Sequence, residues 1–296
     1  MLCSHRHISG AICLSGLLLF GTAFVNAGKV QRNRPITHPG FDPTADRIDL
    51  FDAMAEGHVE TTVIARNARG GSVLIKNTSN EPLTVELPEA FVAVQINKQF
   101  GGGGLGGGMG GAGGMGGGQQ STGGGFGNDG GGAGGGGGGG GFGGAGGGGG
   151  QGFFSIPPEK TVRLPYGSVC LNHGKPEPNS RTRMQMVRVE SYTTDPVLTE
   201  LITMVGTGRL NHESAQAAVW TRTDNMSWND LAGKIVVSAG RKRAYFRPQQ
   251  LQRAQLLVAT ATGRVREKTA NATESNSTVE VITTVPSRGR SGSFGQ

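Results

Sequence analysis

The sequence predicts a mainly β protein with a small α-helical part, and three observations lead to this fold class. Short segments rich in Val, Ile and Thr recur between residues 59 and 192, with turn residues between them. A glycine-rich tract interrupts these segments. After residue 194 the hydrophobic period changes from that of a strand to that of a helix. We therefore expect a β unit that is followed by helices.

The N-terminal residues 1–27 have the pattern of a secretory signal peptide. A weakly basic start at residues 5–7 precedes a mostly apolar run over residues 8–25, and Ala27 offers the small residue needed for cleavage. We expect an exported chain that begins near Gly28 with a polar leader over residues 28–48. After cleavage no transmembrane span is predicted, so the expected location is the periplasm, the cell envelope or the exterior.

Six segments have the composition of β-strands. The segment at 91–97 alternates apolar and other residues with period two, which is typical of a half-buried strand. Short antiparallel strands without helices among them predict an immunoglobulin-like sandwich, with residues 49–100 as its first part and residues 153–194 as its second. The segments are Val59–Ala65, Ser72–Asn77, Leu83–Leu87, Phe91–Asn97, Phe153–Pro165 and Met184–Tyr192.

Residues 101–152 form the glycine-rich tract. Glycine accounts for 37 of these 52 residues, and Asp129 is their only charged residue. Because glycine loses the most backbone entropy on ordering and has no side chain to bury, the tract is predicted to be disordered. The simplest interpretation is a long loop between two strands of one domain, and a linker between two domains is the alternative.

Residues 195–268 are predicted to form a helical subdomain of three or four short helices. Asp195 before Pro196 starts the first helix, Asn211 can cap the second, and a capping box opens the third at residues 227–230. The last helix is expected from Pro248 to about Arg266. Residues 269–296 are predicted to be a flexible basic tail, in which "STVEVITTV" could add an edge strand.

The positive charge of the chain is concentrated near its C-terminus. Residues 241–296 contain ten Lys or Arg and three Glu, a net charge of +7 that equals the net charge of the whole chain. The cluster "GRKRAYFR" at 240–247 predicts contact with an anionic polymer or another envelope component. A solvated basic connector is the alternative, and specific nucleic-acid binding is not predicted for an exported protein.

The segment "CLNHGKPEP" places His173 three residues after Cys170, which is the only cysteine left once the signal is removed. A lone cysteine forms no internal disulfide, so three hypotheses remain for it. The thiol could be a nucleophile that His173 activates, although no orienting partner is visible. It could bind copper or zinc, although one Cys and one His make half a site. It could also be buried at a strand end beside a turn at Gly174.

Two short segments resemble the paired Cys and Gln segments of bacterial thioester adhesins. They are "SVCLN", which contains Cys170, and "SAQAAVW", which contains Gln216. The resemblance covers only a few residues at each place. It implies that the two side chains condense to an internal thioester able to capture an amine.

A wider resemblance rests on "VLIKNTSNEPLTVELPEAF", the glycine-rich insert, the pattern CLxHGKPxP and "AQAAVW...MSWNDLA". This combination resembles a family of exported bacterial proteins without an assigned activity, over roughly residues 49–255. The resemblance implies one folded unit and brings no catalytic residues. The expected function is a non-enzymatic structural or interaction protein of the envelope or exterior, without metal or cofactor. A thiol-dependent surface protein is the alternative, with Cys170 as a nucleophile or joined to Gln216.

Overall fold

The computed structural model of the chain describes residues 34–96, 118–127, 152–238 and 240–283, with side chains up to residue 273. These residues belong to one compact unit. The predicted signal peptide and most of the glycine-rich insert lie outside them. The strands are β1 (Asp46–Asp49), β2 (Val59–Asn67), β3 (Gly70–Asn77), β4 (Leu83–Glu86), β5 (Phe91–Gln95), β6 (Thr122–Gly125), β7 (Phe153–Ile156), β8 (Thr161–Cys170), β9 (Met184–Val187), β10 (Ile235–Ser238) and β11 (Arg241–Ala244). The helices are α1 (Leu50–Ala55), α2 (Val189–Tyr192), α3 (Pro196–Gly206), α4 (His212–Thr223), α5 (Trp228–Gly233) and α6 (Pro248–Thr283).

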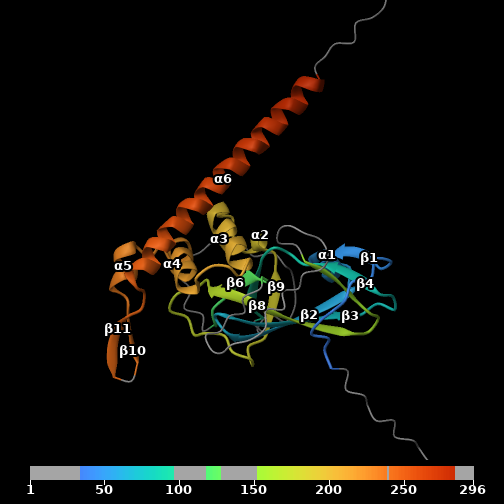
Figure 1. Ribbon diagram of the computed structural model, residues 1–296, viewed down its shortest axis with the longest axis horizontal. Helices are drawn as coiled ribbons and strands as arrows, with labels where there is room; N and C mark the ends of the chain where they lie inside the picture. The colour runs from blue at the N-terminus through green and yellow to red at the C-terminus, as the bar shows by residue number, and fades with distance from the viewer. Residues whose placement is uncertain (1–33, 97–117, 128–151, 239, 284–296) are drawn as a thin grey trace, which may run out of the picture. The chain divides into compact units, whose positions relative to one another are not determined.

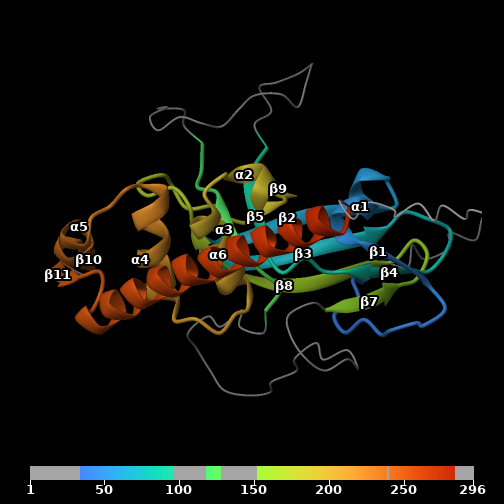
Figure 2. The same ribbon diagram turned by 90° about the horizontal axis from the view of Figure 1, so that it is seen from above.

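Six strands close into a barrel in the order β2, β3, β8, β6, β5 and β9. Each neighbouring pair around the barrel is antiparallel. The mainly β class is confirmed, but the predicted immunoglobulin-like sandwich is wrong, because these strands form one closed sheet instead of two facing sheets. Alternating burial along a strand is common to both architectures, so the period alone did not separate them. A second sheet, β1–β4–β7, lies outside the barrel (Figures 1 and 2).

Strand β6 corrects the prediction that the whole of residues 101–152 is disordered. Its residues Thr122–Gly125 are buried and pair with β5 on one side and β8 on the other. A Cβ on Gly124 would lie 1.9 Å from the carbonyl oxygen of Gly167, and one on Gly123 would lie 3.1 Å from Ile202. Glycine is therefore required here because β8 and α3 approach the strand backbone closely.

The barrel interior is filled by alternate residues of its strands. In β8, burial alternates from Val162 through Leu164 to Tyr166, as period two requires. The Tyr166 ring lies 5.3 Å from the ring of Phe91 in β5. Phe91 also contacts Phe126, which directly follows β6 and lies in the glycine-rich tract. An aromatic residue of that tract therefore belongs to the barrel core.

Helices α3, α4 and α6 pack together beside the barrel and build a second apolar core, which we call the helical cap (Figures 1 and 2). The predicted start signals are confirmed. Asp195 is the N-cap of α3, and Pro196 occupies the first helical position. In α4, Asn211 accepts a hydrogen bond from the backbone N–H of Ser214. In α5, Ser227 forms a capping box with Asp230. Ile202 of α3 packs over Gly123 and so joins the cap to the barrel.

The C-terminal part of the chain differs from the prediction in two ways. Helix α6 continues to Thr283, so the expected end near Arg266 is wrong, as is the edge strand in "STVEVITTV" over its described residues. Residues 269–283 are therefore helical, and residues 284–296 of the predicted tail lie outside the described part. The helical subdomain also contains an unpredicted hairpin, in which β10 pairs with β11. The basic cluster at 240–247 contains strand β11 and the residues that connect it to α6.

Candidate functional site

The candidate site begins where β8 runs past the end of β3. The pairing of these strands ends at Gly70 and Gly167, and the backbone N–H of Ser168 donates to the carbonyl oxygen of Arg69 just beyond. On the opposite edge β8 stays paired, because Cys170 lies opposite Thr122 of β6. The backbone of Cys170 thus needs hydrogen-bond partners on the β3 side that β3 does not provide.

Gln216 of α4 supplies these partners. Its Oε1 accepts a hydrogen bond from the backbone N–H of Cys170 at 2.8 Å, and its Nε2 donates to the carbonyl oxygen of Cys170 at 2.8 Å. Both residues are buried. The side-chain amide therefore continues the strand ladder in place of a neighbouring strand. The structure brings together the Cys and Gln predicted as a pair, and the hydrogen bonds join the amide to the backbone of Cys170.

The thiol of Cys170 lies against the turn that follows β8. Sγ lies 3.4 Å from the backbone nitrogen of Asn172 and 3.3 Å from its carbonyl oxygen. The side chain is buried, and this burial raises the pKa of the thiol to about 11. The group is accordingly protonated at neutral pH, which is opposite to the low pKa of an activated cysteine nucleophile.

His173 is occupied by partners other than the thiol. Its backbone N–H donates to Asp224, and its ring stands edge-on to Trp220 at 4.7 Å between centroids. The ring nitrogen Nε2 lies 2.7 Å from Nζ of Lys234. Burial and the neighbouring Lys234 lower the pKa of His173, so a neutral ring accepts a hydrogen bond from the ammonium group. Among the described residues no hydrogen bond joins His173 to Cys170.

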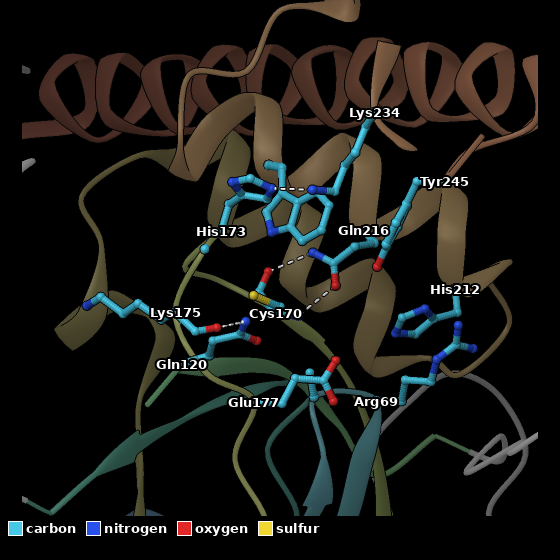
Figure 3. A pocket seen from close by; sticks show the side chains of 13 residues that line it. Arg69, Gln120, Cys170, His173, Lys175, Glu177, His212, Gln216, Lys234 and Tyr245 are labelled. Atoms are coloured by element: carbon cyan, nitrogen blue, oxygen red, sulfur yellow. Dashed lines mark hydrogen bonds between the residues drawn. The ribbon is translucent and has the colours of Figure 1, made fainter. Parts of the chain in front are cut away.

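These residues border a cavity of about 340 Å³ between the end of the barrel and the helical cap (Figure 3). Helix α4 contributes one wall, and the turn between β2 and β3 contributes another. The base of the β10–β11 hairpin closes a third side, where the backbone N–H of Tyr245 donates to the carbonyl oxygen of Lys234. The side chains around the cavity include Arg69, Gln120, Glu177, His212, Trp220 and Tyr245.

His212 illustrates how the cavity fixes the state of its polar groups. Its Nε2 lies 3.1 Å from the carbonyl oxygen of Ser168 and therefore carries the proton. Burial, with a smaller contribution from the positive charge of Arg69, lowers the pKa of His212 to about 4. The ring is neutral at physiological pH, and its Nδ1 is left as an acceptor. Arg69 itself forms an ion pair with Glu213 at 2.8 Å.

Several cavity residues were missed in the sequence analysis. Gln120 lies in the glycine-rich tract, and Lys234 directly precedes the unpredicted hairpin. Tyr245 belongs to the basic cluster at 240–247 that was singled out, but its place beside a cavity was not predicted. The available signal was the run of β-branched residues in "KIVVS" before Gly240, which fits a hairpin strand. Arg69 and His212 come from a turn and a helix start, and nothing in their local sequence marks them as cavity residues.

Within the part of the chain that the structure describes, no group of three or more His, Cys, Asp or Glu side chains is placed to hold a metal ion. Over the same residues no helix is long and apolar enough to cross a membrane. No protein-family model, curated protein or solved structure matches the chain. The resemblances to thioester adhesins and to an exported bacterial family therefore stay predictions.

Proposed function

We propose that the protein is an exported, non-enzymatic interaction protein that binds an anionic surface of the cell envelope through the β10–β11 hairpin. The observation that carries this proposal is the charge of the hairpin. Arg241, Lys242 and Arg243 are exposed and form no ion pair with any described residue. No Asp or Glu occurs between Asp230 and Glu267. The hairpin is therefore a local source of positive potential.

The apolar residues of the hairpin favour a lipid surface over a soluble polymer. Ile235 and Val237 are 56% and 61% exposed. Val237 pairs across the strands with Lys242, so Lys242 shares the face of Ile235 and Val237, whereas Arg241 and Arg243 lie on the other face of the hairpin. Basic residues are attracted to anionic lipid headgroups, and the burial of aliphatic side chains in the interfacial region of the membrane lowers the free energy of binding.

The proposal is tested by cosedimentation of the mature protein with vesicles that contain phosphatidylglycerol. Replacing Arg241, Lys242 and Arg243 together by Gln removes three charges, each worth about 1 kcal/mol near an anionic surface, so binding should weaken about a hundredfold. The matched control replaces three exposed arginines of the barrel region by Gln, and it should bind like wild type: Arg66, Arg181 and Arg183. Wild-type binding by the hairpin variant would refute the proposal.

A second variant separates lipid from polymer. Replacing Ile235 and Val237 by Ser keeps every charge and removes the exposed aliphatic groups. It should weaken vesicle binding and leave retention on immobilised dextran sulfate unchanged. Equal binding of this variant and wild type to vesicles would assign the hairpin to an anionic polymer instead.

A thiol-dependent activity is the second candidate, and the contact between Gln216 and Cys170 favours it. In thioester formation the sulfur of Cys170 bonds to the amide carbon of Gln216, and the amide nitrogen leaves as ammonia with the thiol proton. Intact mass spectrometry decides the matter. A mass short by one ammonia that is full in Cys170→Ala establishes the thioester, and a full mass in both proteins refutes it.

A further inference from the structure

The cavity contains buried polar atoms that the protein does not satisfy. Among the described residues, Oε1 of Gln120 and Nδ1 of His212 have no hydrogen-bond partner. Gln120 is only 7% exposed. Nε1 of Trp220 is likewise without an oxygen or nitrogen partner, but it is directed at the thiol of Cys170. Unpaired buried polar groups are costly, so the two acceptors beside one cavity indicate a ligand that pairs with them.

The orientation of two of these groups is fixed by their other hydrogen bonds. Nε2 of Gln120 donates to the carbonyl oxygen of Lys175, which leaves Oε1 as an acceptor. His212 donates through Nε2 to Ser168 and leaves Nδ1 as an acceptor. Figure 3 shows Gln120 and His212 on opposite sides of Cys170. A ligand that satisfies both must therefore present hydrogen-bond donors on two sides.

The charges around the cavity favour an anionic group of the ligand beside Lys234. Arg69 is paired with Glu213, and Figure 3 shows the side chain of Lys175 directed away from the cavity. Glu177 also lines the cavity. Among the described residues Lys234 forms no ion pair, so an anionic group of the ligand would be attracted to it. A hydroxyl group can donate to Gln120 and His212 without bringing a further charge into a buried site.

The donors of the cavity are arranged at its hairpin side. Nζ of Lys234 lies 5.5 Å from the ring centre of Trp220 and 5.3 Å from that of Tyr245. The ammonium group can therefore donate to a carboxylate that lies beside these two rings. Tyr245 is 38% exposed and adds an aromatic wall next to them. The volume of about 340 Å³ suits a small molecule of one or two rings.

From these contacts we propose that the cavity is a binding site for a hydroxylated carboxylate of the sugar-acid class. The carboxylate accepts a hydrogen bond from Lys234, and hydroxyl groups donate to Gln120 and His212. Tyr245 packs against the carbon face of the ring. The proposal does not depend on vesicle binding by the hairpin, because it concerns groups at the hairpin base and not the cations of β11.

Tryptophan fluorescence provides a direct assay, because the chain has two tryptophans and only Trp220 lines the cavity. Trp228→Phe leaves Trp220 as the single reporter. Titration of this variant with D-glucuronate should give a saturable change. D-glucose lacks the carboxylate and propionate lacks the hydroxyl groups, so each should bind about tenfold more weakly or worse.

In the same background, Lys234→Gln should weaken glucuronate binding about tenfold, since a hydrogen bond to a charged group is lost. Lys76→Gln removes a cation of β3 that does not line the cavity and should leave glucuronate binding unchanged. Thermal melting checks that both variants are folded. The absence of a saturable signal with glucuronate would overturn the proposed site, and equal binding of glucose would overturn its anionic specificity.

Discussion

The hydrogen bonds between Gln216 and Cys170 can be tested by replacing the amide with an apolar group of similar size. Gln216→Leu leaves the N–H and the carbonyl oxygen of Cys170 unpaired, and both residues are at most 3% exposed. Each unsatisfied buried group costs about 1–3 kcal/mol, and the added apolar side chain offsets part of this cost. We expect the free energy of unfolding to fall by about 3 kcal/mol.

The assay is guanidinium-induced unfolding, with the slope of the transition compared between proteins. Gln252→Leu is the matched control, because Gln252 is exposed on α6 and its replacement should change stability by less than about 0.5 kcal/mol. Cys170→Ala adds a sharper comparison. It removes the thiol and keeps the backbone, so the effects of the two changes should be additive in a double-mutant cycle. A loss below about 0.5 kcal/mol in Gln216→Leu, or strong coupling to Cys170→Ala, would refute the backbone bridge.

Three further predictions follow from burial and charge. Cys170, with its pKa raised to about 11, should resist labelling by iodoacetamide in the native protein and react fully after denaturation, and rapid native labelling would contradict its burial. Gly124→Ala should destabilise the barrel by about 3 kcal/mol or more in thermal or denaturant unfolding, because the added Cβ would overlap the backbone of β8. Gly263→Ala, within α6 at a position where a Cβ meets no other atom, should stabilise the protein by about 0.5–1 kcal/mol. Burial alone would raise the pKa of Glu200, but its ion pairs with Arg264 and Lys268 of α6 lower the pKa below 4.5. The contribution of these ion pairs to the free energy of unfolding is therefore present above that pH and is lost on acidification. The stability difference between wild type and Glu200→Gln should shrink between about pH 5 and pH 3, and a constant difference would contradict the ion pairs.

The barrel strands were predictable because their chemistry is local. Val, Ile and Thr, with turn residues between them, placed the barrel strands β2, β3 and β5 close to their observed positions, and β4 of the second sheet as well. The closure of the sheet was not predictable in this way. It depends on β6, whose glycines carry no β propensity and are selected by the close approach of β8 and α3. The glycine content of residues 101–152 therefore predicted disorder for a segment that contains strand β6.

The length of α6 was underestimated for a different reason. The expected end near Arg266 rested on polar composition, yet no Gly or Pro occurs between Gly263 and Pro286. Absence of a stop signal is consistent with helix continuation even in a stretch rich in Asn, Ser and Thr. Earlier in the helix, Ala254 and Ala261 are fully buried against the cap and fix its direction.

The candidate site was partly visible in the sequence. Cys170 and Gln216 were paired by resemblance, and they are in contact, but the contact uses the backbone of Cys170 and leaves the thiol protonated. The residues with unsatisfied polar atoms were not visible, because Gln120 and His212 come from segments whose approach is set by the tertiary fold. A single sequence does not report such approach.

The hairpin connects the two proposals physically. Lys234 directly precedes β10 and Tyr245 directly follows β11, and the hydrogen bond between their backbones at 2.8 Å extends the hairpin ladder to the cavity. Phe246, only 2% exposed, anchors the end of this ladder in the core of the helical cap. An isolated two-stranded hairpin is marginally stable, so contacts at its base contribute strongly to its order. A ligand held by Lys234 and Tyr245 would therefore also order the strands that present Arg241 and Lys242 to an anionic surface.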